Sequence, residues 1–302
     1  MSGEEREKRM PESVRTPGRT WTEFPEFERG SGSGTLEVET PDGVTVERGS
    51  RAVKLVEKER NGLVGEHLGA LADEDTVTVR IPETVSEPVN IRTRLEEGFY
   101  PHHVVVVVGE GASARVVEEN MGGGELDSAV VEAVVGDGAE LEYTRVNSLG
   151  DSAGHSLGRV EAGENADVDW TTVSTGSDVY KSTVETKLDG SYSSLDHALA
   201  FLSSGQQHMD HTVKVVHAAD STSCDIEARG VAMESSRAVY KGVQEVKEEA
   251  ERTESFQNEE TVLIGDDAEA DTTPQLRIDN SDVEATHAAA TGHLDEEDLF
   301  YM

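Results

Sequence analysis

Cysteine is almost absent from the chain: among its 302 residues only Cys224 carries a thiol. One cysteine excludes a disulfide within the chain, and it excludes a zinc or iron–sulfur site closed by the chain's own thiolates. Two catalytic signatures are also missing, the Gly-x-x-x-x-Gly-Lys-Ser/Thr loop of ATPases and the Gly-x-Ser-x-Gly elbow of serine hydrolases. The sequence therefore predicts a chain that does not hydrolyse ATP by itself.

Long apolar runs are absent as well. The longest, Val104–Val108, has the length of a strand, whereas a membrane-spanning helix needs about 18 or more apolar residues. The first residues, MSGEEREKRM, are charged, and no apolar run follows them as it would in a signal peptide. We therefore expect a cytoplasmic protein.

Basic residues are scarce. Lys and Arg number 26 against 62 Asp and Glu, which gives a formal net charge of −36. On a folded surface of about 12,000 Å² this leaves one carboxylate per ~200 Å², and the Debye length falls from about 8 Å at physiological salt to about 3 Å at 1 M. The composition favours a halophilic, acidic protein, and the alternative is an acidic face for a basic partner. A basic stripe for nucleic acid is missing.

What the sequence does contain is a repeat of 27 residues. Each unit is a β-rich run, a Gly-Asp/Glu-Gly/Asn corner and a second, alternating run. The markers are Gly109, Gly136, Gly163 and Gly190, with Ala112, Ala139 and Ala166 three places after the first three. Units of one length that cannot each bury an apolar face indicate an all-β solenoid of stacked coils. A row of β-hairpins in a sandwich is the alternative, because Gly-Asp-Gly is also a hairpin signal.

The composition also suggests boundaries. Residues 1–35 mix Pro, Gly and Ser with isolated aromatic rings and predict a flexible leader. The stretch 56–75, VEKERNGLVGEHLGALADED, is the one plausible internal helix. We expect the β-solenoid over residues 36–292 and the start of a C-terminal helical segment over residues 293–302.

Histidines gather in QQHMDHTVKVVH, which contains His208, His211 and His217 beside Asp210. This spacing could hold a metal, but on a strand His208 and His211 would point to opposite faces. Structural, hydrogen-bonded histidines are the alternative interpretation. The same alternative applies to His102 and His103, which open an apolar strand.

The second half of the chain carries motifs in a definite order. They are Gln207-His208 with Asp210, His217 with Thr222 and Ser223, Gly230-Val231, SRAVY at 236–240 with Gly242, and Thr253 with Gln257 and Asn258. Two longer blocks follow, LIGDDAEADTTPQLRI and DVEATHAAATGHLDEEDLFYM. Over about residues 90–302 this series resembles the SufB/SufD family of iron–sulfur cluster assembly proteins.

The resemblance implies a right-handed parallel β-helix, in agreement with the repeat. It also implies a cytosolic scaffold, not an enzyme, that works with the ATPase SufC in a pair of SufB-type and SufD-type subunits; a homodimer is the alternative. The cofactor it implies is iron or an iron–sulfur cluster, held transiently and shared with a partner, and no nucleotide.

Two positions favour the SufD branch. The SufB branch carries a cysteine in the TESFQNEE region and a glutamate after the histidine of the terminal motif, where this chain has Glu259 and Ala288. The SufD branch instead pairs that histidine with a small residue, as in His287-Ala288.

The resemblance places His287 at the contact between two β-helix subunits, where an imidazole can ligate iron or transfer a proton near pH 7. His287 and Glu259 are the main candidates for cluster, iron or interface contacts, and His287 is the candidate metal ligand; interface packing is its alternative role. The weaker candidates are His293, Cys224, His208 and His211. For Cys224 the alternative is a small buried hydrophobic residue.

In the family, LDEEDLFY opens a helical C-terminal region that docks the ATPase. Because the chain stops at Met302, the resemblance predicts a short form that lacks most of this region, with SufC docking in doubt. A different class, a polysaccharide-acting or carbohydrate-binding β-helix protein, would need aromatic platforms and export. Aromatic residues make up only 5% of the chain, which disfavours it.

Overall fold

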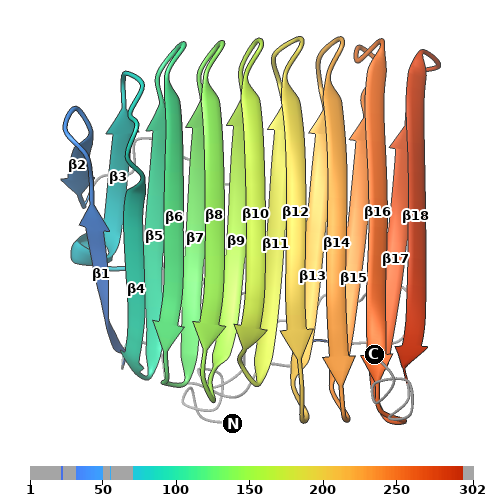
Figure 1. The fold of residues 1–302 in the computed structure, drawn as a ribbon. Helices are drawn as coiled ribbons and strands as arrows, with labels where there is room; N and C mark the ends of the chain where they lie inside the picture. Colours follow the sequence, from blue (N-terminus) through green and yellow to red (C-terminus); the bar gives the residue numbers. More distant parts are fainter. Residues whose placement is uncertain (1–21, 23–31, 50–54, 56–70, 295–302) are drawn as a thin grey trace, which may run out of the picture.

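The computed structural model describes residues 22, 32–49, 55 and 71–294. The chain passes between two facing sheets in successive coils (Figure 1). Sheet A contains β1 (Ser33–Glu39), β4 (Val89–Glu97), β6 (Ser113–Gly122), β8 (Glu140–Leu149), β10 (Asp167–Gly176), β12 (Ser194–Ser203), β14 (Ser223–Met233), β16 (Thr253–Ile264) and β18 (Val283–Leu294). Sheet B contains β2 (Thr45–Arg48), β3 (Thr76–Ile81), β5 (Phe99–Val108), β7 (Leu126–Val135), β9 (Ala153–Ala162), β11 (Val179–Leu188), β13 (His208–His217), β15 (Arg237–Val246) and β17 (Glu269–Ile278).

Strand direction distinguishes the two architectures that the repeat allowed. From β4 to β18 in sheet A and from β3 to β17 in sheet B, every neighbouring pair is parallel. Among the strands of the described residues, only β1 on β4 and β2 on β3 run antiparallel. The predicted parallel β-solenoid is confirmed, and the hairpin sandwich is excluded. No helix within the described residues is long and apolar enough to cross a membrane.

The repeat glycines stack in register at one corner of the coils, as the spacing predicts. The N–H groups of Gly136 and Gly163 donate to carbonyls of the preceding coil at 3.0 and 2.9 Å. A Cβ on Gly190 would lie 2.0 Å from the backbone nitrogen of Glu164. The first corner position therefore needs glycine because coils approach closely there, and not because of its φ angle.

Positive φ angles occur at the third corner position. They are 67° at Gly111, 65° at Gly138 and 54° at Asn165, in the left-handed region that glycine and asparagine tolerate best. In later coils Tyr192, Ser221 and Arg252 hold this conformation.

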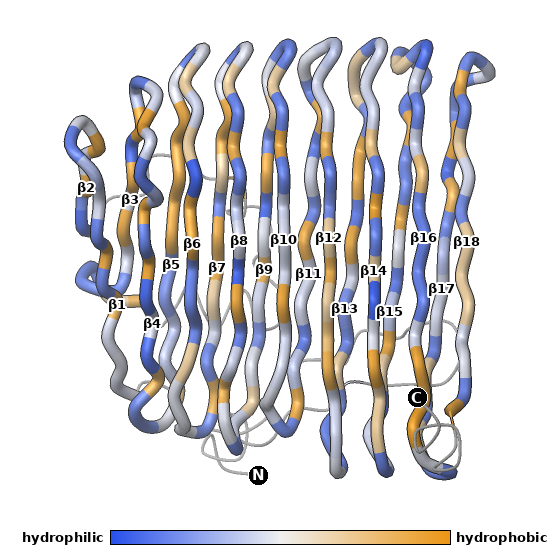
Figure 2. The backbone as a smooth tube through the Cα atoms, in the orientation of Figure 1, coloured by the Kyte–Doolittle hydropathy of each residue, from blue (hydrophilic) through white to orange (hydrophobic). Residues whose placement is uncertain are grey.

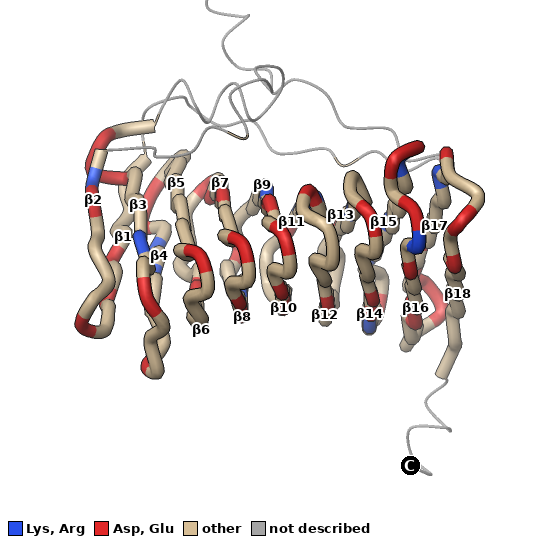
Figure 3. The backbone as a smooth tube through the Cα atoms, turned by 90° about the horizontal axis from the view of Figure 1, so that it is seen from above, with Lys and Arg blue, Asp and Glu red and all other residues tan. Residues whose placement is uncertain are grey.

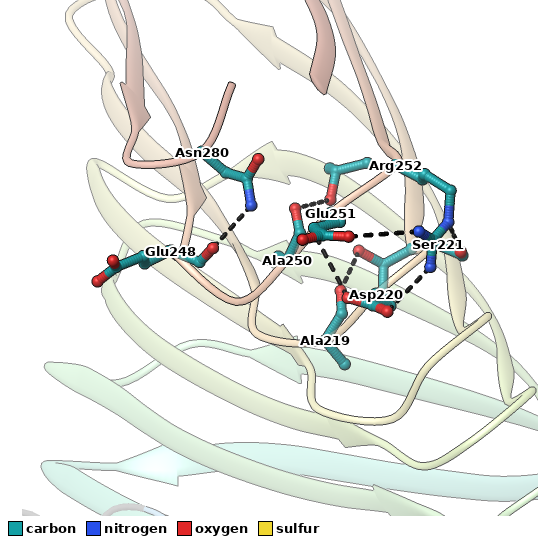
Figure 4. Close-up of polar contacts among 10 residues, drawn as sticks. Ala219, Asp220, Ser221, Glu248, Ala250, Glu251, Arg252 and Asn280 are labelled. Atoms are coloured by element: carbon teal, nitrogen blue, oxygen red, sulfur yellow. Dashed lines mark hydrogen bonds and ion pairs between the residues drawn. The ribbon is translucent and has the colours of Figure 1, made fainter. Parts of the chain in front are cut away.

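Side-chain contacts support these later corners (Figure 4). The Arg252 guanidinium donates to Asp220 at 2.9 Å and to Ser221 at 3.1 Å, one coil earlier. Asn280 donates to the Glu248 carbonyl at 2.7 Å. The longer C-terminal coils thus use side-chain ties where the early coils use glycine.

Alternation along each strand builds the core. In β8 the burial pattern alternates strictly over its first four residues, with Leu141 and Tyr143 buried, and Figure 2 shows the matching alternation of hydropathy along the strands. Stacked coils place like residues over one another, so the rings of Tyr143 and Trp170 lie parallel with centroids 4.2 Å apart. We call positions between the two sheets inward and positions on the outer faces outward.

The outward face of sheet A carries a ladder of acids. Glu142, Asp169, Asp196 and Asp225 are register neighbours on β8, β10, β12 and β14, and adjacent strands are about 4.8 Å apart. Partial burial first, and then the neighbouring carboxylates, raise the pKa of Asp169 and of Asp196. Acidic residues also recur along the coils in Figure 3.

We expect Asp196→Asn to raise the melting temperature in dilute buffer and to change it little in 1 M KCl, where screening already removes the repulsion. A carboxyl group whose pKa is higher in the folded state stabilises the fold at pH values below its unfolded-state pKa. This stabilisation is lost as the pH rises through the folded-state pKa. Stability at low salt should therefore increase as pH falls from neutrality. Thermal melts over a salt and pH grid test this; a melting temperature that is independent of salt would contradict it.

The N-terminal segment contacts sheet B through two described residues. Thr22 is buried and its hydroxyl donates to Asp210 at 2.5 Å, and the Leu55 N–H donates to Glu132. Lys181 also contacts Asp210, at 2.5 Å. Asp210 and Glu132 occupy outward positions of sheet B, and both are buried.

The boundary predictions differ from the structure at two places, and a third prediction lies largely outside the described residues. β1 begins at Ser33, within the predicted leader, whose aromatic rings lie outside the described residues. Of the predicted helix at 56–75, residues 56–70 lie outside the described residues, and the rest includes only the 3-10 turn η2 (Asp73–Asp75). His293 was predicted to open a helical segment, but it lies in β18 because the pairing with β16 continues to Leu294. Residues 295–302, and with them the predicted C-terminal helix, are not described.

Candidate functional site at the open end of the solenoid

The two ends of the solenoid differ. At the N-terminal end the antiparallel strands β1 and β2 cover the sheets. At the C-terminal end β17 and β18 have a hydrogen-bonded neighbour on one side only within the described residues (Figure 1). A strand edge of this kind presents unpaired N–H and C=O groups that can pair with another chain.

His287 lies on this open edge. Its register partner in β16 is Gln257, which occupies a buried inward position. Since parallel partners share a face, His287 lies at an inward position one coil beyond Gln257, but it is exposed because the described solenoid ends there. The residues after it are Ala288, Ala289 and Ala290, and they are exposed too.

Glu259 lies one coil deeper and is fully buried. Thr261 donates a hydrogen bond to its carboxylate, and burial, as the largest cause, raises the pKa of Glu259. Its register partner is Ala289, so no long side chain covers it from β18. A carboxylate at this depth is expensive to ionise without a compensating charge.

Three more polar side chains share this interior with Glu259. Tyr240, Gln244 and Gln257 are each at most 3% exposed. The Tyr240 hydroxyl and both amide atoms of each glutamine have no hydrogen-bond partner among the described residues. We call Tyr240, Gln244, Gln257 and Glu259 the end chamber.

Gly242 makes room for this arrangement. A Cβ on Gly242 would lie 2.2–2.4 Å from the Gln257 amide atoms. The Gln257 amide therefore reaches across the interior to sheet B at the position where Gly242 has no side chain. Gly242 lies between Tyr240 and Gln244 on β15. The Gln257 amide therefore enters the space between these two side chains.

Cys224 does not have the properties of a reactive thiol. It is buried at 3% exposure, and burial raises its pKa well above the usual range. Thiolate chemistry requires the opposite, an accessible cysteine with a lowered pKa. Its register partner Ser255 is held by His217 Nε2 at 3.0 Å. The structure thus favours the interpretation of Cys224 as a small buried residue.

The remaining histidine candidates are separated from the open end or from one another. His208 is outward on β13 and contacts Thr22, whereas His211 is inward and fully buried, with its pKa lowered to about 4 by burial. They point to opposite faces and do not form a shared metal site. His293 is exposed on β18. No group of three or more His, Cys, Asp or Glu among the described residues could hold a metal ion by itself.

A second buried polar cluster lies in the early coils, and the sequence did not reveal it. Arg145 is 1% exposed and lies 3.5 Å from Glu118, which also accepts from Tyr143 at 2.7 Å. His102 lies 3.4 Å from Asp127. The sequence signal for this cluster was a charged residue at an inward position of a strand, such as Arg145 in β8. It could not be used, because only the strand register shows which positions are inward.

Comparison with known proteins identifies a family and several relatives. Residues 91–302 match the family described as "SUF system FeS cluster assembly, SufBD core domain". The chain is 29% identical over 128 residues to the chloroplastic iron–sulfur cluster assembly SufBD family protein ABCI8 of Arabidopsis thaliana. The aligned stretch covers 42% of the chain and 23% of the relative. It is 26% identical over 127 residues to the iron–sulfur cluster assembly protein SufD of Bacillus subtilis, covering 42% of the chain and 29% of the relative.

A further relative is SufD of Escherichia coli, 36% identical over 72 residues, or 24% of the chain and 17% of the relative. The aligned stretches thus span less than a third of the length of these relatives. The family match itself extends over more than two thirds of this chain and includes the open end with His287. The chain belongs to the SufBD family.

Proposed function

We propose that the chain is a SufD-like scaffold subunit of the SUF-type iron–sulfur cluster assembly system, without turnover of its own. It acts with a SufB-type subunit and the SufC ATPase in the cytoplasm. The observation that carries the proposal is the open edge of β18, which exposes His287 on a chain of the SufBD family.

The partner in this proposal is a second β-solenoid that pairs with the free edges of β17 and β18. Edge pairing supplies main-chain hydrogen bonds to groups that are otherwise unpaired. The small residues Ala288, Ala289 and Ala290 allow the second backbone to approach. His287 would then lie at the junction of the two subunits.

The chain's own chemistry requires that partner. Its one cysteine is buried and has a raised pKa, so a thiolate ligand for iron or a cluster would come from the other subunit. This chain would contribute the His287 imidazole. Iron or the cluster is cargo that the two subunits share. The SufD-like role is supported by Glu259 and Ala288, which occupy the positions that distinguish the SufB branch.

Proline substitutions in β18 test the edge pairing. Adjacent residues of a strand direct their N–H groups to opposite sides. One of the two variants Ala288→Pro and Ala289→Pro therefore removes a hydrogen bond to β16, and the other blocks the outer edge of β18. We expect the edge-blocking variant to keep the wild-type melting temperature and to lose at least tenfold in affinity for a co-expressed SufB-type subunit. Size-exclusion chromatography of the mixture measures this. If both variants bind normally, β18 is not the interface.

A further inference from the structure

The end chamber holds an ionisable group whose charge is not balanced by its surroundings. Glu259 is fully buried, and the described residues give it no ion pair. All five described lysines lie on the outward side of β11, β13 and β15 or in the turn after β15. Among the charged side chains that act on Glu259, Arg229 has the largest effect, but it is outward and pairs with Glu227 and Glu260.

The other chamber groups can supply oxygen ligands. The amide oxygens of Gln244 and Gln257 and the hydroxyl oxygen of Tyr240 are buried, and none of them has a hydrogen-bond partner in the part of the chain that the structure describes. Unpartnered buried polar atoms cost about 1–3 kcal/mol each. A set of this kind is retained more readily if something occupies the space between the groups.

We propose that the end chamber binds a monovalent alkali cation, with Glu259 as the charged ligand and Gln244, Gln257 and Tyr240 as neutral oxygen ligands. Carboxylate and carbonyl oxygens suit hard cations. The single carboxylate favours a monovalent over a divalent cation. One positive charge neutralises it, whereas a divalent ion would leave one buried positive charge uncompensated. The site concerns the interior of the chain itself and does not depend on the proposed partner.

Gly242 is part of this site because its missing side chain admits the Gln257 amide. Inward residues at the open end, such as Pro274 of β17, are only partly buried, so the proposed ion would enter from that end. Binding would fix Gln257 directly below His287, its register neighbour.

Thermal melts at constant ionic strength test the proposal, with KCl or NaCl compared against choline chloride, whose cation is much larger than an alkali ion. We expect the wild type to melt several degrees higher in the alkali salts. Glu259→Gln should remove this difference. The matched control is Glu260→Gln, the next residue on β16, which is outward and exposed and should keep it, since general screening is equal in both salts.

Direct detection covers the case in which Glu259→Gln does not fold. Crystals of the wild type grown in RbCl should show an anomalous peak between Glu259 and Gln257. Equal melting temperatures in choline and alkali chlorides, or equal loss of the difference in both variants, would overturn the proposal. So would an end chamber that contains only water in the rubidium crystal.

Discussion

Replacement of His287 with alanine is expected to reduce iron–sulfur cluster loading at least tenfold in a complex reconstituted with SufB-type and SufC-type partners. The fold should not change, because His287 is exposed at the end of the described solenoid and makes no described hydrogen bond. Loss of an orienting group near a metal commonly costs 10–100-fold, and loss of a ligand costs at least as much. Iron and acid-labile sulfide content per complex, together with visible absorption, measure the effect.

Two other histidines serve as controls. His293→Ala changes the same exposed strand at another inward position and should load clusters as the wild type does. His208→Ala removes a contact to Thr22 on the outward side of sheet B, so it should affect stability and not loading at equal folded fraction. Normal loading by His287→Ala, or an equal loss in His293→Ala, would remove His287 from the proposed function.

The sequence predicted the architecture because the coil corner constrains the chain most tightly. At Gly190 a Cβ would lie 2.0 Å from the backbone of the preceding coil, and at Gly136 it would lie 2.9 Å from it, so this corner position requires glycine. Such positions recur with every coil, so the spacing is visible without a structure. The later corners do not follow this glycine spacing. At Arg252 a long side chain makes the contact to the preceding coil, and the coils there are longer.

The candidate site was predicted only in part. His287 was identified through the family resemblance, and the structure places it on the open edge. The end chamber was not foreseen apart from Glu259, since the burial of Gln244 and Gln257 follows from their inward position and from the gap at Gly242. Among so many acids, no single carboxylate such as Glu118 could be recognised as internal before the register was known.

Glu118 gives the largest expected effect on stability. Glu118→Leu would leave Arg145 fully buried without the carboxylate that lies 3.5 Å from it, and Tyr143 without its acceptor. Breaking a buried ion pair by removing one partner costs about 3–5 kcal/mol. We therefore expect a large decrease in the free energy of unfolding, measured by urea denaturation in high salt, where the acidic surface is screened.

Glu119→Leu is the matched control, because the next residue on β6 is outward and its pair with Arg92, at 3.1 Å, is exposed. Such a surface pair is worth about 0–1 kcal/mol. The double variant Glu118→Leu/Arg145→Met should recover much of the lost stability, since removing both buried charges also removes their desolvation cost. If Glu118→Leu costs no more than Glu119→Leu, or if the double variant is as unstable as the two single losses combined, the buried pair does not carry the charge coupling that its geometry indicates.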